Sequence, residues 1–299
     1  MGDDDAPCVV IATLNWNRPD DTLACLASAA AQDYPNIRLL VVDNASSDDS
    51  VAQIASAFPH ATLVQNSHNA GFAGGCNLAL RHALALGAEY VFLVNNDTFF
   101  APDMLRQLVA HRSPEIGVLV PAIFRADAPE QAWSIGGMRH PLTLEKTGDI
   151  PAALGPALAA GYAEREYVVG CALLFSRIVL LAVGGFDERF FMYYEDMDLS
   201  LRVRAAGFRI MLVPQARMWH KVATSSGGSD SPNERYWMAR SSVLFFRKHV
   251  RGPRWLVVVP FRAASALRTS LRLLRAGRTP ALRAYWRGLR DGLGERPCT

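Results

Sequence analysis

Three acidic residues follow a run of large apolar side chains in the second half of the chain. Glu195, Asp196 and Asp198 come directly after the stretch FFMYY, residues 190–194. Burying a charged carboxylate costs free energy and raises the pKa of the carboxyl group. A carboxylate with a raised pKa is a good general base, whereas one in the first turn of a helix stabilises the helix dipole. The helical spacing up to Gly207 leaves both roles open.

A second polar cluster ends the apolar run VFLVNNDT, residues 91–98, with Asn95, Asn96 and Asp97. A carboxylate beside amide oxygens suits a hard divalent cation that is shared with phosphates. The alternative is an Asx turn, in which Asp97 caps the following segment. His220 ends another apolar run, and imidazole suits Mn²⁺ better than Mg²⁺ or Ca²⁺. These residue types are compatible with a metal site, although each alone is more often structural.

The glycine-rich stretch NAGFAGGCN, residues 69–77, lacks the GxGxxG spacing of dinucleotide-binding proteins, and it follows the third predicted strand. The chain also has no GK[ST] motif, which argues against a P-loop. Gly71, Gly74 and Gly75 are able to let backbone N–H groups approach a phosphate. They are equally compatible with tight turns.

The first hundred residues alternate between apolar runs and segments with helical spacing, which predicts a doubly wound, mostly parallel α/β sheet. Ligands bind at the carboxyl ends of the strands in such sheets. Strands are expected at 8–14, 37–46, 61–66 and 90–97, and helices at 20–32, 50–58 and 74–87. Polar side chains follow these strands: Thr13 and Asn15, Asp43 and Asn44, Asn66 and Asn69, and Asn95 to Asp97.

The pattern is irregular from 125 to 166, where we expect loops and a short hairpin. Strands are then expected at 167–177 and 209–220, and helices after residue 177, from 195 to 207 and at 234–250.

The composition predicts a folded protein of a reducing compartment. Half of the 299 residues are hydrophobic, and the five cysteines are scattered, without metal-ligand spacing. The acidic start MGDDDAPC is unlike a signal peptide, so a cytoplasmic location is expected.

The last fifty residues, 250–299, carry a net charge of +9 from 11 arginines and two acids, whereas the rest of the chain is acidic. The apolar run 255–261 is far shorter than the ~20 residues needed to cross a bilayer. The arginines recur with amphipathic spacing. Two interpretations remain open: an interfacial helix on anionic lipid at the cytoplasmic face of the membrane, or a basic helix packed on the body.

The order of these motifs resembles family 2 glycosyltransferases of the GT-A fold, and within them the bacterial rhamnosyltransferase-like members. The resemblance covers about residues 8–222. It rests on ATLNWNRPDD, LLVVDNASSDDS, NAGFAGGCN, VFLVNNDT, GCALLFSR, GGFDERFFMYYEDMDLSLRVRAAG and WH. It implies a GT-A domain over 1–249, with a nucleotide-sugar half at 8–124, an acceptor half at 125–249 and a basic extension at 250–299.

The resemblance also implies roles for individual residues. Asp196 is the expected general base, with Glu195 beside it, and Asp97 and His220 are the expected ligands of Mg²⁺ or Mn²⁺. Asn95 stands where the family's DxD motif has its first acid, a departure that other rhamnosyltransferase-like members share. The expected donor-binding residues are Thr13, Asn15, Arg18, Asp43, Asn69, Gly71, Asn77, Asn95 and Asn96. The expected acceptor-side residues are Asp187, Tyr194 and Trp219.

The function implied is inverting transfer of a sugar, with dTDP-L-rhamnose as the favoured donor and a lipid-linked or cell-surface glycan as the acceptor. UDP-galactofuranose, UDP-N-acetylglucosamine or GDP-mannose are alternative donors. A nucleotide-sugar-binding protein without turnover is the alternative of a different class. No nucleic acid is expected as a partner.

Overall fold

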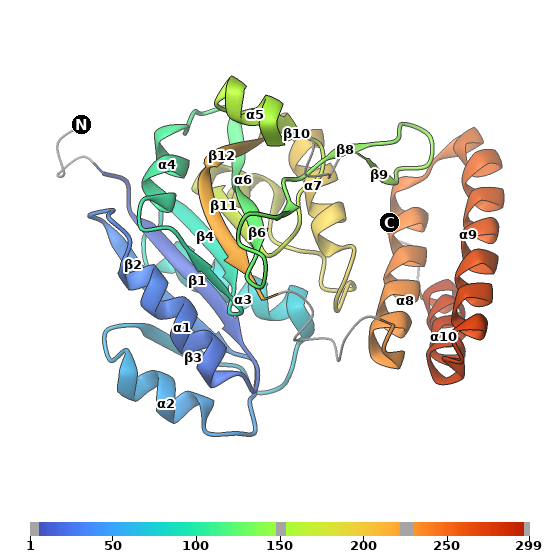
Figure 1. Ribbon diagram of the computed structural model, residues 1–299, viewed down its shortest axis with the longest axis horizontal. Coiled ribbons are helices and arrows are strands. Elements are labelled where there is room, and N and C mark those ends of the chain that lie inside the picture. The colour runs from blue at the N-terminus through green and yellow to red at the C-terminus, as the bar shows by residue number, and fades with distance from the viewer. Residues whose placement is uncertain (1–5, 148–153, 222–229, 296–299) are drawn as a thin grey trace.

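The computed structural model describes residues 6–147, 154–221 and 230–295, which form an α/β body and a group of C-terminal helices beside it (Figure 1). The strands are β1 (Val9–Asn15), β2 (Ile37–Asp43), β3 (Thr62–Gln65), β4 (Tyr90–Asn95), β5 (Thr98–Phe100), β6 (Ile116–Arg125), β7 (Ala132–Ser134), β8 (Met138–Arg139), β9 (Lys146–Thr147), β10 (Ala163–Arg165), β11 (Ala172–Ser176) and β12 (Arg209–His220). The helices are α1 (Pro19–Ala30), α2 (Ser50–Ala57), α3 (Gly71–Ala85), α4 (Met104–Ala110), α5 (Leu154–Ala160), α6 (Arg177–Val183), α7 (Glu195–Ala205), α8 (Pro232–His249), α9 (Trp255–Arg275) and α10 (Thr279–Gly294).

The described strands form a 10-stranded sheet in the order β10-β12-β6-β11-β4-β1-β2-β3, with β5 on β12 and β7 on β6. Strands β1 to β4 pair in parallel, as predicted. Strand β11 runs antiparallel to both β4 and β6, so the sheet is mixed but mostly parallel. The carboxyl ends of β1, β2 and β4 therefore lie at one edge, where the polar residues predicted for the site are found.

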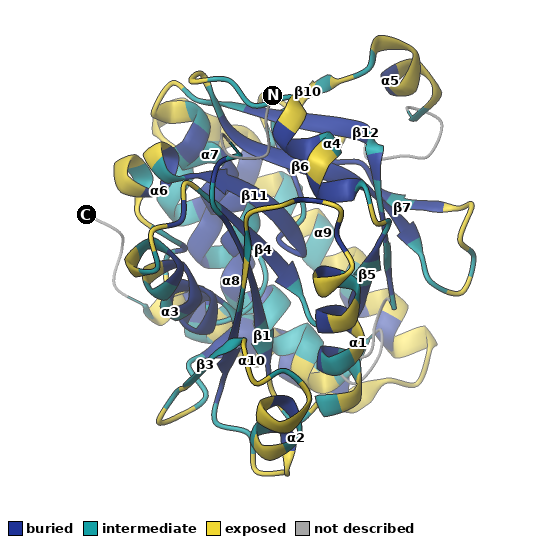
Figure 2. Ribbon diagram, turned by 90° about the vertical axis from the view of Figure 1, so that its left-hand side faces the viewer, coloured by how far each residue is buried: buried dark blue, intermediate teal, exposed yellow. Residues whose placement is uncertain are grey.

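The sheet is buried on both faces (Figure 2). Alternate residues of each strand point to opposite faces, so Val10 of β1 belongs to the core cluster that includes residues of α3, α6 and α7, whereas Val9 belongs to the one that includes residues of α1 and α4. Because both faces are covered, the strands appear in the sequence as continuous apolar runs rather than as alternating apolar and polar residues.

The irregular region predicted at 125–166 contains the expected short hairpin, formed by β8 and β9. It also contains β7, α5 and β10, which the sequence pattern did not indicate. The strand expected from residue 167 begins only at Ala172, because Tyr167 instead pairs with Gly137 next to the hairpin.

The C-terminal segment folds as two helices rather than one. Gly288 and Gly292 let α10 lie directly against α8, because a Cβ on either would come within 2.3 and 2.7 Å of the carbonyl oxygens of Tyr236 and Arg240. Of the two interpretations left open for this segment, α10 thus fits the helix packed on the body. Helix α9 instead leaves a row of apolar side chains exposed: Leu256, Val259, Leu267, Leu271 and Leu274.

The four described cysteines, Cys8, Cys25, Cys76 and Cys171, are all free, and Cys298 lies outside the described residues.

Candidate active site

The carboxyl ends of β1 and β2 are joined by a buried polar network around Asp43. Asn15 donates from Nδ2 to Asp43 Oδ1 at 2.8 Å, and Ser46 donates to the same oxygen at 2.6 Å. Thr22 donates to Asn15 Oδ1 at 2.7 Å, and Asn96 donates to Thr22 Oγ1 at 2.9 Å. Asn15 and Ser46 thus hold the carboxylate of Asp43 in one orientation, and Thr22 and Asn96 extend the network to α1 and to the turn after β4.

The glycine-rich segment begins α3 and contacts the segment before the predicted base. Asn69 Oδ1 accepts from Gly71 N at 2.9 Å, and Phe72 N donates to Phe191 O at 2.8 Å. Gly71 has a φ of +73°, and a Cβ there would lie 2.5 Å from Phe191 O. Glycine is therefore required at this position for close backbone contact, whatever its role toward a donor.

The remaining predicted donor residues fall into two groups. Thr13 is buried in β1, and Arg18 lies 3.7 Å from Asp21 at the start of α1. The side chain of Asn77 instead bonds to the backbone of Phe186: it donates to Phe186 O at 2.9 Å and accepts from Phe186 N at 2.7 Å. The side chain of Asn77 therefore anchors the segment before α7.

Asp97 and His220 lie together because β5 pairs with the end of β12. The register places Thr98 opposite His220, and His220 Nε2 lies 3.1 Å from Asp97 Oδ1. Both side chains are buried, and the ring of Trp133 packs edge-on against the imidazole at 4.7 Å. Among the described residues, His220 Nδ1 has no hydrogen-bond partner.

This pair fits a divalent cation only in part. A carboxylate and an imidazole are suitable ligands for Mn²⁺. Within the described ranges, however, the structure holds no group of three His, Cys, Asp or Glu side chains arranged for a metal. The remaining ligands would have to come from the diphosphate of a donor and from water, as is common for Mg²⁺ and Mn²⁺ at nucleotide sites.

Asp196 has the surroundings of a general base. It lies in the first turn of α7 and is partly exposed, and its carboxylate accepts from Gly170 N at 3.1 Å and Met197 N at 2.7 Å. Burial raises the pKa of Asp196, while the charge of Lys146, the two N–H groups and the charge of Arg139 oppose that rise. The carboxylate is thus ionisable and accessible, with a raised pKa.

Glu195 is more deeply buried than its neighbour. Burial raises the pKa of Glu195 well above its usual range, and the charge of Asp196 raises it further. Its Oε2 has no hydrogen-bond partner within the described part of the chain. The two preceding residues, Tyr193 and Tyr194, have φ of 65° and 66°, a strained conformation for side chains of this size. Such strain is frequent where a functional carboxylate is held in place.

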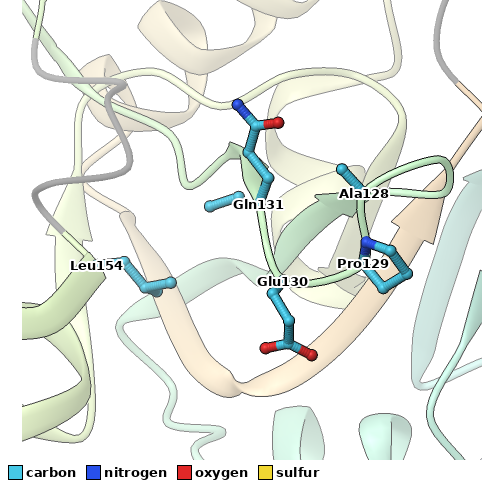
Figure 3. A pocket seen from close by; sticks show the side chains of 6 residues that line it. Ala128, Pro129, Glu130, Gln131 and Leu154 are labelled. Atoms are coloured by element: carbon cyan, nitrogen blue, oxygen red, sulfur yellow. The ribbon is translucent and has the colours of Figure 1, made fainter.

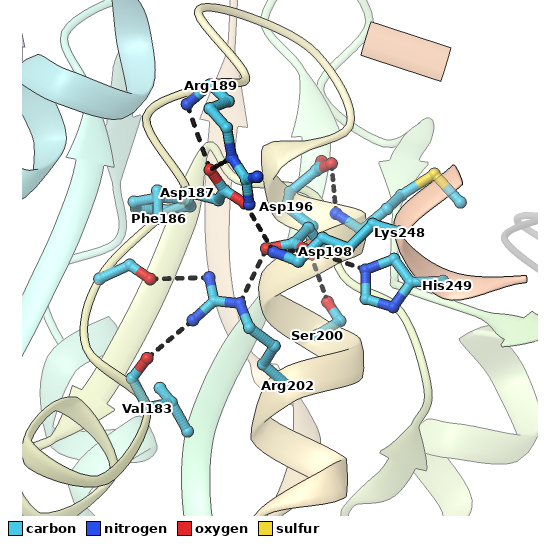
Figure 4. Close-up of polar contacts among 12 residues, drawn as sticks. Val183, Phe186, Asp187, Arg189, Asp196, Asp198, Ser200, Arg202, Lys248 and His249 are labelled. Carbon is cyan, nitrogen blue, oxygen red and sulfur yellow. Dashed lines mark hydrogen bonds and ion pairs between the residues drawn. The ribbon is translucent and has the colours of Figure 1, made fainter. Parts of the chain in front are cut away.

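Asp198 belongs to a buried ionic network that ties α7 to α8 (Figure 4). It is fully buried and lies 2.8 Å from Arg202 Nε, 2.6 Å from Lys248 Nζ and 2.7 Å from His249 Nε2. Burial alone would raise the pKa of Asp198, but the hydrogen bond from His249 and the charges of Arg202 and Lys248 outweigh it and lower the pKa. Capping was one of the two roles left open for this acid, and the observed contacts are ion pairs.

The three predicted acceptor-side residues differ in their positions. Asp187 accepts from Arg189, and Lys248 Nζ lies 2.7 Å from it, in the network of Figure 4. Tyr194 packs on Phe245 of α8, with 5.4 Å between ring centroids. Trp219 stacks on Phe99, and its Nε1 donates to Pro129 O. Successive strand residues point to opposite faces, so Trp219 lies away from His220, and the indole beside His220 is that of Trp133.

Sequence reasoning missed the basic residues that approach α7 from other elements. Arg139 and Lys146 of the hairpin act on Asp196, and Lys248 and His249 at the end of α8 contact Asp198. No local pattern marks these residues, because only the fold brings the hairpin and α8 to α7.

A depression of about 590 Å³ lies elsewhere, lined by Ala128, Pro129, Glu130, Gln131, Ala132 and Leu154 (Figure 3). Its surface is mostly apolar and contains none of the predicted catalytic or metal residues. We therefore place the candidate site at Asp43, Asp97 and Asp196 rather than here.

Comparison with known proteins agrees with this geometry. Residues 8–150 match the family described as glycosyl transferase family 2, and residues 90–286, well over half of the chain, match glycosyl transferase family group 2. The chain belongs to glycosyltransferase family 2. The prediction of a glycosyltransferase enzyme with a GT-A-like fold is thereby confirmed.

Two curated relatives are rhamnosyltransferases by name. The glycosyltransferase is 27% identical over 226 residues to the N-acetylglucosaminyl-diphospho-decaprenol L-rhamnosyltransferase of Mycobacterium tuberculosis, covering 68% of this chain and 72% of the relative. It is 23% identical over 229 residues to the dTDP-rhamnosyl transferase RfbF of Shigella flexneri, covering 72% of each. The predicted resemblance to rhamnosyltransferases is confirmed at this modest identity.

Solved structures confirm the fold. The mannosyltransferase PcManGT from Pyrobaculum calidifontis, in complex with GDP-Man and Mn²⁺, matches with a TM-score of 0.60 and 20% identity over 99% of this chain and 78% of its own. Residues 1–349 of TarS from S. aureus, in complex with UDP, match with a TM-score of 0.55 and 16% identity over 96% and 92%. At these identities the likeness shows the fold alone.

Proposed function

We propose that this glycosyltransferase moves L-rhamnose from dTDP-L-rhamnose to a lipid-linked or cell-surface glycan, with inversion at the anomeric carbon. The observation that carries the proposal is Asp196, a partly exposed carboxylate with a raised pKa in the first turn of α7, which accepts a hydrogen bond from Gly170 just before β11. The names of the relatives from M. tuberculosis and S. flexneri support rhamnose as the sugar.

In the proposed reaction an acceptor hydroxyl attacks the anomeric carbon of the donor sugar. The bond from that carbon to the diphosphate oxygen breaks, and Asp196 takes the proton of the hydroxyl. One base is sufficient for an inverting transfer, because the hydroxyl has only one proton to lose. Asp43, held by Asn15 and Ser46, is the proposed contact for the nucleotide base.

Asp97 and His220 are the proposed ligands of Mg²⁺ or Mn²⁺. Such an ion, when bound, offsets the negative charge of the departing nucleoside diphosphate. Asn95 supplies a neutral amide where a second acid would strengthen binding. We therefore expect the ion to bind together with the donor rather than tightly on its own.

A thermal-shift panel of dTDP, UDP and GDP and their sugars, with and without Mn²⁺, tests the donor. A ligand of the folded state raises stability by mass action, by about 2.7 kcal/mol at a hundredfold excess over Kd. Metal-dependent stabilisation by dTDP-rhamnose above the others is the expected result. Stronger stabilisation by UDP-galactofuranose, UDP-N-acetylglucosamine or GDP-mannose would transfer the proposal to that donor.

We also propose that α9 attaches the enzyme to an anionic membrane surface at its cytoplasmic face. No helix in the described ranges has the length and apolar character to cross a bilayer. The exposed apolar side chains on α9 instead follow helical spacing in two groups, Leu256 with Val259 and Leu267 with Leu271 and Leu274. Exposed arginines, among them Arg268 and Arg275, accompany them. An apolar stripe with basic neighbours suits the interface of an anionic bilayer.

Flotation with vesicles tests the attachment. The full-length enzyme is expected to float with vesicles that contain phosphatidylglycerol and to stay at the bottom with purely zwitterionic ones. Leu267→Gln with Leu271→Gln should abolish flotation. Leu181→Gln on α6, an equally exposed leucine on another surface, is the control and should float normally. A wild-type enzyme that remains wholly in solution with anionic vesicles would refute the attachment.

A further inference from the structure

The hairpin next to the base carries two positive charges on one face. Arg139 of β8 lies directly opposite Lys146 of β9. Both cations lie over the ring of Tyr167, with 5.8 Å from Arg139 Cζ and 5.3 Å from Lys146 Nζ to the ring centroid. Like charges directly opposite each other in an antiparallel pair repel. An arrangement of this kind is stable when an anion lies between or beside the two charges.

Arg139 fixes the hairpin to the helix of the base. Its Nη2 donates to Met197 O at 2.6 Å, one residue after Asp196, and its guanidinium also faces the ring of Phe245 at 5.7 Å. The side chain is 8% exposed, and Nη1 has no hydrogen-bond partner among the described residues. Arg139 is thus a rigid, buried positive charge close to the carboxylate of Asp196.

Lys146 is the exposed member of the pair. Within the described ranges, no carboxylate forms an ion pair with its ammonium group. Two neighbouring acids are engaged by other groups: Glu145 lies 3.6 Å from Arg262, and Glu166 accepts from the backbone N–H of Arg139. The charge of Lys146 also acts on Asp196 and lowers the pKa of that carboxyl group. The positive charge of Lys146 therefore remains available to an anion that arrives from solution.

The position of the hairpin indicates which anion this is. The contact between Glu145 and Arg262 joins the hairpin to α9, and Figure 1 shows β8 and β9 between α7 and the C-terminal helices. The hairpin that carries the two cations thus lies between the helix of Asp196 and the helix proposed to face the membrane. In a lipid-linked acceptor, the reacting sugar lies at the base and the lipid lies in the bilayer. The group between them is the phosphate linker.

We propose that Arg139 and Lys146 form a subsite for the diphosphate of a lipid-linked acceptor, with Lys146 as the direct contact. A lysine ammonium is a point charge that binds phosphate oxygens well. The inference rests on the proposed function, because it assumes that Asp196 receives the acceptor. It goes further in selecting a diphosphate-linked acceptor over a neutral glycan.

The test uses two acceptors with the same sugar, N-acetylglucosamine, and the same alkyl chain, joined either through a diphosphate or directly. Calorimetric binding without a donor is measured for the wild-type enzyme, Lys146→Ala, Lys146→Arg and Arg81→Ala. Arg81 is an exposed arginine on α3 and serves as the control. We expect the wild type to prefer the diphosphate acceptor by about tenfold, which is about 1.4 kcal/mol. Lys146→Ala should remove this preference, and the other two variants should keep most of it.

Kinetics with the same acceptors separates the alternatives. Lys146→Ala should raise KM for the diphosphate acceptor and leave KM for the neutral acceptor unchanged. Because the charge of Lys146 also lowers the pKa of Asp196, any change in kcat should be the same with both acceptors. A wild type that binds both acceptors equally would overturn the inference, whether or not it transfers sugar. An equal rise in KM for both acceptors in Lys146→Ala would also overturn it, because Lys146 would then not recognise the diphosphate. Preferred diphosphate binding without any transfer would instead count against the proposed function.

Discussion

Replacing Asp198 by Asn tests whether the buried ionic network positions the base helix. Asp198 is fully buried in α7, and its carboxylate contacts Arg202, Lys248 and His249 within 3 Å. Asparagine has nearly the same size but no charge. Steric effects are therefore small, and the measured change reports the loss of the negative charge from the network.

The size of the expected loss of stability depends on the contacts that Lys248 and Arg202 keep in the variant. Lys248 retains Asp187 at 2.7 Å, and Arg202 retains the carbonyl oxygens of Val183 and Gly185. Removing one partner of a buried ion pair typically costs about 3–5 kcal/mol. Because these cations keep other partners, we expect a loss of unfolding free energy at the lower end, about 3 kcal/mol.

Urea unfolding at pH 7 measures this loss, and Asp127→Asn is the control. Asp127 forms an ion pair with Arg125 too, but its side chain is 70% exposed, so solvent screens the pair and only a small loss is expected. A loss for Asp198→Asn no larger than that of the control would refute the reasoning. Lys248→Met completes a double-mutant cycle, in which non-additive losses are expected because the two residues touch.

The effect also has a predicted pH dependence. The pKa of Asp198 is lowered in the folded state from its ordinary value of 3.8. The stabilisation is therefore fully present above that ordinary value and is lost as the pH falls from 3.8 through the lowered pKa. The difference between the wild type and Asp198→Asn should stay constant from pH 7 to pH 5. A difference that disappears already between pH 7 and 6 would contradict this prediction, because a carboxyl group with a lowered pKa does not titrate there.

Three further predictions concern the site. Gly71→Ala should lower the free energy of unfolding in urea by about 2–4 kcal/mol, because φ is left-handed there and the new Cβ would clash with Phe191 O. Gly87→Ala is the control: its φ is also positive but it lies in open space, so the expected loss is only about 1 kcal/mol. Asp196 accepts a proton only when it is ionised, and burial raises its pKa above the ordinary value of 3.8. The logarithm of kcat should therefore fall as the pH drops through that raised pKa, and a flat profile down to pH 4 would contradict this. His220→Gln should weaken the Mn²⁺-dependent part of dTDP binding in a thermal-shift assay and leave the metal-free part unchanged; equal loss of both parts would argue against a metal ligand.

Much of the fold is predictable from the sequence because the α/β units depend on local patterns. The apolar runs of β1, β2 and β4 and the polar residues that end them were placed within a few residues of their observed bounds. The same runs identify Asp43, Asp97 and Asp196, since each polar group interrupts an apolar pattern. Asp97 and His220 were paired only through the family resemblance.

The parts that were missed depend on long-range packing. The mixed sheet arises because β11 inserts antiparallel between β4 and β6, and an apolar run does not specify its own direction. Arg139 and Lys146 lie in a region with weak periodicity, and Lys248 is one of several basic residues at the end of a helix, so nothing local distinguishes them. The packing of α10 on α8 likewise depends on Gly288 and Gly292, whose spacing on α10 matters only beside α8.

The most direct test of the account is sugar transfer by Asp196→Asn beside the wild type, with dTDP binding measured on the same preparations. The account predicts that the wild type transfers rhamnose to a diphosphate-linked acceptor. Asp196→Asn should lose at least about a hundredfold in kcat, as expected for a missing general base, and keep the wild-type Kd for dTDP. Unchanged turnover in Asp196→Asn would contradict the account, because the proton of the acceptor would then leave by another route.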